Sequence, residues 1–350
     1  MHMADALISP SVAGTMLAVT AGLAAYSVKK VQGELDDKKI PLMGVMGAFI
    51  FAAQMINFTI PGTGSSGHIG GGILLAALLG PYAGFLTMAS LLLIQALFFA
   101  DGGLLAYGCN VINMGFFTCF LAYPIIYKMI NRRGFNVKRI WMASVVAVII
   151  ALQLGSFSVV LQTLLSGKTE LPFTTFVLLM QPIHLAIGLV EGLVTGAVLT
   201  FVWQARPEIL DRAVTGTALG NLSIKKVLIG LAIAIVLVGG GLSWFASSNP
   251  DGLEWSIERT AGTAELEVYD SIHSTLASIQ EKTAFLPDYG FKPTAALTAI
   301  KPNTDAQKSW PAVNAGTSVS GLAGGALTLV LVGLIGFIIV LIKKKKNPVA

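Results

Sequence analysis

Long apolar runs, separated by short polar segments, follow one another along the chain. A helix needs about 20 apolar residues to cross a bilayer, and most of these runs are close to that length or longer. They predict membrane-spanning helices at 10–28, 42–60, 70–79, 81–100, 104–127, 140–165, 174–203, 225–246 and 322–342. The run at 70–79 is short and ends at the helix-breaking pair Gly80-Pro81. It is either a short span or the beginning of one kinked helix over 70–100.

Basic residues between the runs indicate the number of spans and their orientation. They gather in four clusters, which follow the runs that end at 28, 127, 203 and 342. The positive-inside rule places such clusters in the cytoplasm. The chain must then cross the membrane an even number of times between the first two clusters, so 70–79 counts as a span. The prediction is nine spans, with the N-terminus outside and the C-terminus inside.

Composition agrees with a membrane protein and argues against other classes. Of 350 residues, 54% are apolar and 12% are charged, and the mean hydropathy is +0.75. Soluble domains carry about 25% charged residues. The net charge of +5 arises from basic clusters between apolar runs, so it does not indicate nucleic-acid binding. We predict an all-α polytopic membrane protein embedded in a lipid bilayer.

Two histidines are expected on the outer face. His2 is next to the chain start, and His68 lies in the glycine-rich segment IPGTGSSGHIGG at 60–71. A Met-His terminus offers three nitrogens in one plane: the Met1 amine, the deprotonated His2 amide and the His2 imidazole. With the His68 imidazole as fourth ligand, the set suits Ni(II) or Cu(II), and Co(II) is close in affinity. The alternative is a coincidental Met-His and a solvated loop histidine.

Four motifs, in order, resemble the CbiM/NikM family, the substrate-binding membrane subunits of energy-coupling-factor transporters for cobalt and nickel. They are MHMADALISP, GTGSSGHIGGG, LLLIQALFFADGG with the following NVINMG, and HLAIGLVEGLVTG, and the resemblance covers about residues 1–205. It implies a seven-helix membrane domain. It also implies that the metal ligands are Met1, His2 and His68.

The end of the chain resembles the small companion subunit of the nickel branch, through SNPDGLEWSIERTAG and the later LPDYGF. That companion has two spans flanking an outer loop, so the resemblance implies a fused protein, and both the fusion and the PDGLE motif favour nickel over cobalt. The outer loop shows helical periodicity only around 264–281, and we expect it to be partly ordered, with His273 at its surface. The predicted parts are a metal-binding domain at 1–205, a cytoplasmic linker at 206–224, a companion domain at 225–342 with its outer loop at 247–320, and a basic cytoplasmic tail at 343–350.

Other polar residues are candidates to support the metal ligands or to hold helices together. His184 and Glu191 are seven residues apart in one apolar run, so they share a helix face. An ionisable residue within a span is a functional candidate by default. For Glu191 the alternatives are a contact with a partner subunit and a hydrogen bond that fixes helix packing. The remaining candidates are Asp5, Ser66, Gln95, Asp101, Asn110 and Asn113.

The sequence contains no ATPase motif: SGKTE at 166–170 lacks the first glycine of a phosphate-binding loop. Uptake against a gradient therefore needs partners, and the resemblance implies a transmembrane coupling subunit with paired cytoplasmic ATPases. We expect a subunit of a prokaryotic inner-membrane transporter, not an enzyme, that carries Ni(II) or Co(II) as substrate and has no organic cofactor. The alternatives are a stand-alone secondary transporter or channel and, less favoured, an intramembrane metalloenzyme, for which an HExxH motif is lacking.

Overall fold

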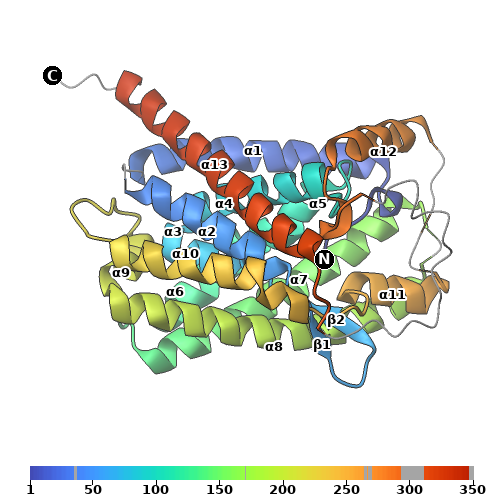
Figure 1. The fold of residues 1–350 in the computed structure, drawn as a ribbon, viewed down its shortest axis with the longest axis horizontal. Helices are drawn as coiled ribbons and strands as arrows, with labels where there is room; N and C mark the ends of the chain where they lie inside the picture. Colours follow the sequence, from blue (N-terminus) through green and yellow to red (C-terminus); the bar gives the residue numbers. More distant parts are fainter. Residues whose placement is uncertain (35–37, 170, 264–265, 267–269, 293–310, 347–350) are drawn as a thin grey trace.

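A computed structural model of the chain describes residues 1–34, 38–169, 171–263, 266, 270–292 and 311–346. Nearly all regular elements among these residues are helices (Figure 1), which confirms the predicted all-α class. The one sheet in the described ranges is an antiparallel hairpin of β1 (Phe58–Ile60) and β2 (Ser65–Gly67), in which Phe58 pairs with Gly67.

The helices follow the apolar runs in order. Three shorter ones, α2 (Lys39–Gln54), α3 (Gly72–Leu79) and α10 (Lys225–Gly240), occupy three of the predicted runs. Within the described part of the chain, 6 helices are long and apolar enough to cross a membrane. These are α1 (Pro10–Glu34), α4 (Pro81–Ile94) with a π-helical extension to Phe99, the continuous helix that contains α5 (Tyr107–Val111) and α6 (Lys128–Asn131), α7 (Val137–Ser166), α8 (Phe173–Ala205) and α13 (Ala315–Lys346).

The run at 70–79 is a separate helix, so the alternative of one kinked helix over 70–100 is wrong. Every residue of α3 is buried, and Gly80, at φ 82°, ends α3 directly before Pro81 begins α4. A Cβ on Gly84 would lie 3.0 Å from backbone atoms of Leu75 and Ala76. Residues eight apart in one straight helix are separated by about 12 Å. The chain therefore folds back, and α3 and α4 form a hairpin.

The predicted helix over 42–60 is too long. α2 ends at Gln54, and the three residues of β1 pair with β2 instead of continuing the helix. Aromatic and β-branched side chains such as Phe58, Thr59 and Ile60 favour strands over helices. The hairpin reverses the direction of the chain after α2, so the glycine-rich segment with His68 returns toward the bundle.

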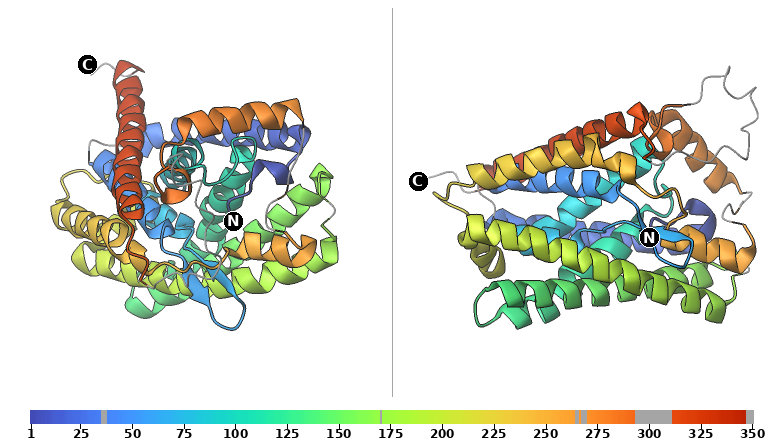
Figure 2. Two further views of the ribbon diagram at one scale, coloured as in Figure 1. Left: turned by 45° about the vertical axis from the view of Figure 1, so that its right-hand side comes forward. Right: turned by 60° about the horizontal axis from the view of Figure 1, so that its bottom comes forward.

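The last two apolar helices join the same bundle as the others. α10 and α13 both pack against α2, and α13 also packs against α4. Figure 1 shows Met1, the β-hairpin, α11 (Gly252–Ala261) and α12 (Ser271–Thr283) at one end of the bundle. α9 (Pro207–Thr215) lies at the other end, and both views of Figure 2 agree with this separation. The predicted linker is thus partly helical, and its Ile209 and Leu210 are buried.

His273 is buried, contrary to the prediction of a surface position. The residue is 5% exposed. Its Nδ1 lies 2.7 Å from Asp270 Oδ1, and its Nε2 lies 3.0 Å from the carbonyl oxygens of Asp5 and Ile8. These contacts fasten α12 across the N-terminal segment, an arrangement that periodicity within the loop does not encode. In the same loop, α12 lies where the helical periodicity predicts a helix, whereas α11 forms where the sequence shows no such periodicity. Residues 293–310 of this loop are outside the described residues.

Candidate metal site

The N-terminal segment runs through the interior at this end of the bundle. Met3 and Ile8 are fully buried. Asn110 pairs with the backbone of Met3 on both sides: its Oδ1 accepts from the Met3 N–H at 2.7 Å, and its Nδ2 donates to the Met3 carbonyl at 3.2 Å. The Asp5 carboxylate accepts a hydrogen bond from the Ala106 N–H at 2.9 Å. Asn110 and Asp5 therefore position the first residues of the chain.

The glycine-rich segment after the β-hairpin holds His68. The Glu191 carboxylate, on α8, accepts hydrogen bonds from the N–H groups of Gly70 and Gly71 at 2.7 and 2.8 Å. Gln54 donates to the Gly70 carbonyl at 2.8 Å. Gly71 has φ 81°, and a Cβ on it would lie 2.5 Å from a side chain of α2, so glycine is required there. Glu191 thus fixes the loop that carries His68 within the bundle.

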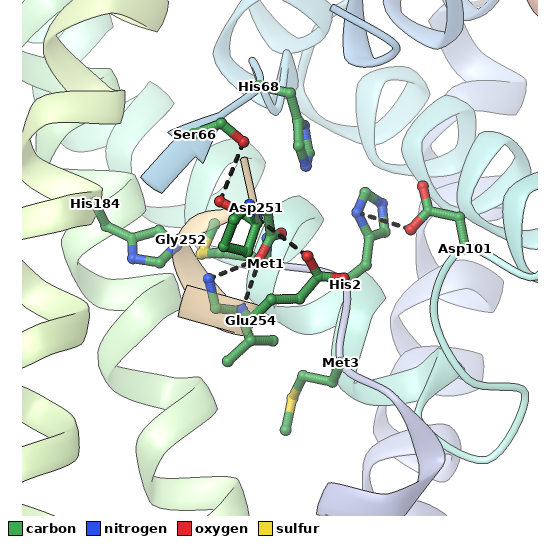
Figure 3. A network of polar contacts seen from close by, with 12 residues as sticks. Met1, His2, Met3, Ser66, His68, Asp101, His184, Asp251, Gly252 and Glu254 are labelled. Carbon is green, nitrogen blue, oxygen red and sulfur yellow. Dashed lines mark hydrogen bonds and ion pairs between the residues drawn. The ribbon is translucent and has the colours of Figure 1, made fainter. Parts of the chain in front are cut away.

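The imidazoles of His2 and His68 lie face to face, with ring centroids 5.2 Å apart and planes inclined by 24° (Figure 3). His2 Nε2 lies 3.2 Å from Gln95 Oε1, and His2 Nδ1 lies 3.4 Å from Asp101 Oδ1. His68 Nδ1 lies 3.1 Å from the Ile69 carbonyl oxygen. Since a carbonyl only accepts, Nδ1 of His68 carries the proton and its Nε2 keeps a lone pair.

The Met1 amine reaches the same place and contacts the second half of the chain. Its ammonium group donates to Asp251 Oδ2 at 3.3 Å. Asp251 belongs to the PDGLE motif and caps α11, where its Oδ1 accepts from the N–H groups of Leu253 and Glu254 at 2.8 Å each. The Glu254 carboxylate accepts from the Asp251 N–H at 3.1 Å, which completes a capping box.

The rest of the PDGLE motif fits between the β-hairpin and α8. The Ser66 N–H donates to the Pro250 carbonyl and the Ser66 hydroxyl to the Asn249 carbonyl, each at 2.8 Å. A Cβ on Gly252 would lie 2.6 Å from Ile183 Cγ2, so the motif needs its glycine for this close approach. Ser66, a candidate to support the metal ligands or to hold elements together, binds the backbone of Asn249 and Pro250.

The LPDYGF motif reaches the opposite side of His2. The Tyr289 hydroxyl donates to Asp101, and Gln95 Nε2 donates to the Tyr289 oxygen at 3.2 Å. The Tyr289 ring stacks on Phe99, with centroids 5.2 Å apart. Gln95 and Asp101 are the side chains next to the two His2 nitrogens. Tyr289 contacts both, so it connects the companion loop, the predicted outer loop at 247–320, to the surroundings of the His2 ring.

Sequence reasoning assigned no site role to Asp251, Glu254 or Tyr289. The signals were present, because PDGLE and LPDYGF carry these residues, but they indicated only a companion subunit. Neither motif is near His2 or His68 in the sequence, so nothing local indicated the contact.

Asn113 and His184 lie near the N-terminal segment, and their side chains hydrogen-bond to other groups. Asn113 exchanges two hydrogen bonds with Gln162 of α7, at 2.9 and 3.0 Å, and its Nδ2 lies 3.4 Å from Met3 Sδ. It therefore joins α7 to the N-terminal segment. His184, on α8, is 1% exposed, and its Nδ1 donates to the Met180 carbonyl at 2.8 Å.

Burial keeps both imidazoles neutral. Burial, followed by the positive charge of the Met1 amine, lowers the pKa of His68 to about 4. Burial also lowers the pKa of His2, although Asp101 opposes this effect. Burial favours the neutral form of Asp251, but the charge of the Met1 ammonium outweighs it and lowers the pKa of this carboxyl. At neutral pH the two rings therefore offer lone pairs beside a charged carboxylate.

Two cavities adjoin these groups. A small one of about 20 Å³ is bordered by Met1, His68, His184, Glu191 and Asp251, among others. A larger one of about 460 Å³ lies between the N-terminal segment and the companion loop, and its lining includes His2, Asp101, Asp251, Glu254 and Tyr289. Among the described residues, no three His, Cys, Asp or Glu side chains make up a metal-binding group.

Comparison with known proteins agrees with these observations. Residues 2–209 match the CbiM family, described as the cobalt uptake substrate-specific transmembrane region, and residues 225–341 match the PDGLE domain. A protein of Archaeoglobus fulgidus, provisionally named as a fused nickel transport protein, NikMN, is 35% identical over 67% of this chain and 75% of its own length. A cobalt transport protein, CbiM, of Sorangium cellulosum is 34% identical over 49% of this chain and 76% of its own length.

A solved structure is similar to 59% of the chain. It is the crystal structure of a truncated transition metal transporter, 32% identical, with a TM-score of 0.52 over 59% of this chain and 99% of that one. The proteins matched here are named as metal transporters, which confirms the prediction of a transporter subunit and not an enzyme. The chain belongs to the CbiM family and carries a PDGLE domain fused behind its CbiM region.

Proposed function

We propose that this chain captures Ni(II), with Co(II) as a second substrate, at the outer face of a prokaryotic inner membrane. It acts as the substrate-binding subunit of an ATP-driven energy-coupling-factor importer. Its ligands are the Met1 amine, the His2 amide and imidazole, and the His68 imidazole. The relatives named for nickel and cobalt transport support the choice of metal, and the fused arrangement shared with a protein named for nickel favours nickel.

One observation carries the proposal: the Met1 amine, His2 and His68 meet at one buried place although 66 positions separate the two histidines. The two imidazoles are neutral there, as a metal ligand requires. The His2 amide and amine are adjacent on the chain, so a metal ion closes a five-membered ring with them. His2 Nδ1 closes a six-membered ring once it turns from Asp101 toward the ion.

Four nitrogens in a plane suit Ni(II), because square-planar nitrogen sites are typical of Ni(II) and Cu(II). Binding takes a proton from the His2 amide, which offsets part of the charge of the ion. The Asp251 carboxylate lies beside the amine and stabilises the remaining positive charge, and a metal-bound amine still has N–H groups to donate to it. Gln95 and Asp101 orient the His2 ring.

The chain needs partners for transport. It contains no ATPase motif, so a coupling subunit and paired cytoplasmic ATPases supply the energy. Their ATP-driven movement displaces the N-terminal segment or the His68 loop and thereby opens the chelate. Transport of Ni(II) into vesicles by this chain alone would contradict the proposal and favour a stand-alone transporter.

The decisive experiment measures metal content and the visible spectrum of three purified proteins. They are the native chain starting at Met1, a variant with two residues added before Met1, and His68→Ala. We expect about one Ni(II) per native chain, with the yellow absorption of square-planar nickel, and loss of both in the two variants. If the extended variant binds Ni(II) as the native chain does, the amine is not a ligand and the proposed site is wrong.

A further inference from the structure

His184 has a nitrogen that the fold leaves open. The residue is 1% exposed and lies within α8. Its Nδ1 donates to the Met180 carbonyl at 2.8 Å, so this nitrogen carries the ring proton. Its Nε2 therefore presents a lone pair, and among the described residues this atom has no hydrogen-bond partner. A buried polar atom without a partner costs free energy and calls for an explanation such as a bound water or ion.

The His184 ring borders the smaller of the two cavities, the one of about 20 Å³. His184 lines it together with Met1, His68, Glu191 and Asp251. Its volume of about 20 Å³ is enough for one water or one ion, since roughly 10–15 Å³ measured in this way holds a water. Figure 3 shows the His184 ring directed toward Met1 and Asp251, from the side of the site opposite His2.

The surroundings of His184 suit a metal donor. Metal-binding histidines usually donate their other ring N–H to a carbonyl or carboxylate, as Nδ1 does here toward Met180. Gly252 of the PDGLE motif also keeps this space open. A Cβ on Gly252 would lie 3.3 Å from His184 Cε1 and 2.6 Å from Ile183 Cγ2, so a side chain there would crowd the imidazole.

We propose that His184 Nε2 is a further nickel donor, a transfer position that Ni(II) occupies on its way into or out of the planar nitrogen site. This inference rests on the proposed function. Square-planar nickel exchanges its ligands by adding an incoming donor before an old one leaves. A neutral imidazole beside the site supplies that donor, and it addresses the slow release that a tight chelate would otherwise show.

The transfer position has a kinetic signature. A donor that binds the ion only in passing lowers the barrier in both directions, because it stabilises the intermediate and not the loaded site. Its loss therefore slows loading and release by the same factor, and the equilibrium dissociation constant stays the same. A structural role would instead change the affinity or the thermal stability.

The test uses the full chain in detergent, loaded with one Ni(II), and follows the nickel absorption in stopped flow. Loading is measured with free Ni(II), and release with an excess of a chelator. We compare the native chain with His184→Leu, which removes the donor, and with His184→Met, which replaces the nitrogen donor by a sulfur donor. The control is Ile187→Leu, which alters the same cavity without removing a nitrogen.

We expect both rates to fall about tenfold or more in His184→Leu, with partial recovery in His184→Met and native rates in Ile187→Leu. Unchanged rates in His184→Leu would overturn the inference and assign the cavity to water. A weaker equilibrium affinity in that variant would overturn it too, because His184 would then support the loaded site. A native chain that holds no Ni(II) would contradict the proposed function itself, a result distinct from both.

Discussion

Asp251 connects the two halves of the chain through a single carboxylate. One oxygen caps α11 and the other accepts a hydrogen bond from the Met1 ammonium. A substitution that keeps the cap but removes the charge can separate these two tasks. Asparagine is such a residue, since asparagine and aspartate are equally good helix caps.

Asp251→Asn and Asp251→Ala should both weaken Ni(II) binding, by about tenfold or more, because side chains that support metal ligands commonly contribute this much. Only Asp251→Ala should also lower the free energy of unfolding, by about 1 kcal/mol, through the lost cap. Competition with a coloured chelator measures the affinity, and chemical denaturation measures the stability. Native affinity in Asp251→Asn would show that the charge does not serve the metal site.

Tyr289→Phe removes only the hydroxyl between Gln95 and Asp101 and leaves the ring stacked on Phe99. We expect a loss of Ni(II) affinity of up to about tenfold, because the two neighbours of His2 lose their common partner. Tyr26→Phe, at an exposed position of α1, is the matched control and should bind as the native chain does. Equal affinity in both variants would mean that Tyr289 acts through packing alone. Isothermal titration with Ni(II) distinguishes these outcomes.

At the scale of elements, α12 fixes the path of the N-terminal segment through His273. Burial disfavours the charged imidazole, but the hydrogen bonds with Asp270 and with the carbonyl oxygens of Asp5 and Ile8 raise the pKa of His273. The hydrogen bonds from His273 lower the pKa of Asp270. A histidine whose pKa is raised in the folded chain adds stability at pH values below its ordinary pKa, and this contribution disappears as pH rises through the folded pKa. An aspartate whose pKa is lowered in the folded chain adds stability at pH values above its ordinary pKa.

The contact is therefore most stabilising from about pH 4 to about pH 6.5, between the ordinary pKa values of the two groups. His273→Gln should lower the melting temperature more at about pH 6 than at about pH 9. It should also speed hydrogen exchange of residues 1–8 most strongly at the lower pH. Ser274→Ala, on the exposed side of α12, serves as control. An equal effect of His273→Gln at both pH values would show that the imidazole is uncharged in the folded chain.

At the scale of the whole molecule, the surface matches a bilayer. Large apolar side chains are exposed on several helices, for example Leu161, Leu185, Ile233 and Leu334. The candidate metal site, α11 and α12 lie at one end of the bundle, and α9 lies at the other. If the basic clusters are cytoplasmic, as the positive-inside rule predicts, the candidate metal site faces outward. Nine spans and this orientation remain predictions.

Cysteine labelling tests the orientation. The native Cys109 and Cys119 are buried, so their background reaction should be low. A membrane-impermeant maleimide should label Thr275→Cys, on α12, in intact cells. It should label Lys138→Cys, at the start of α7, only after the membrane is opened, because the positive-inside rule places this cluster in the cytoplasm. The reverse pattern would invert the proposed topology, and labelling of both in intact cells would contradict the number of spans.

The sequence alone was sufficient for properties that depend on local chemistry. Apolar runs of membrane length predict helices wherever they occur, and six of them are confirmed as long apolar helices in the described residues. The proposed Met-His chelate also depends on local chemistry, because its first three nitrogens are adjacent on the chain, and it stays a prediction. The prediction of His68 as the fourth ligand rests on its glycine-rich segment, which is expected on the same face.

Only the tertiary structure could decide which distant groups meet. Asp251 lies 250 positions from the Met1 amine that it contacts, and Tyr289 lies 188 positions from Asp101. No periodicity or spacing encodes such contacts, because they depend on how α10 and α13 pack against α2 and on where the loop between them returns. For the same reason the buried position of His273 and the open nitrogen of His184 became visible only once the helices were assembled.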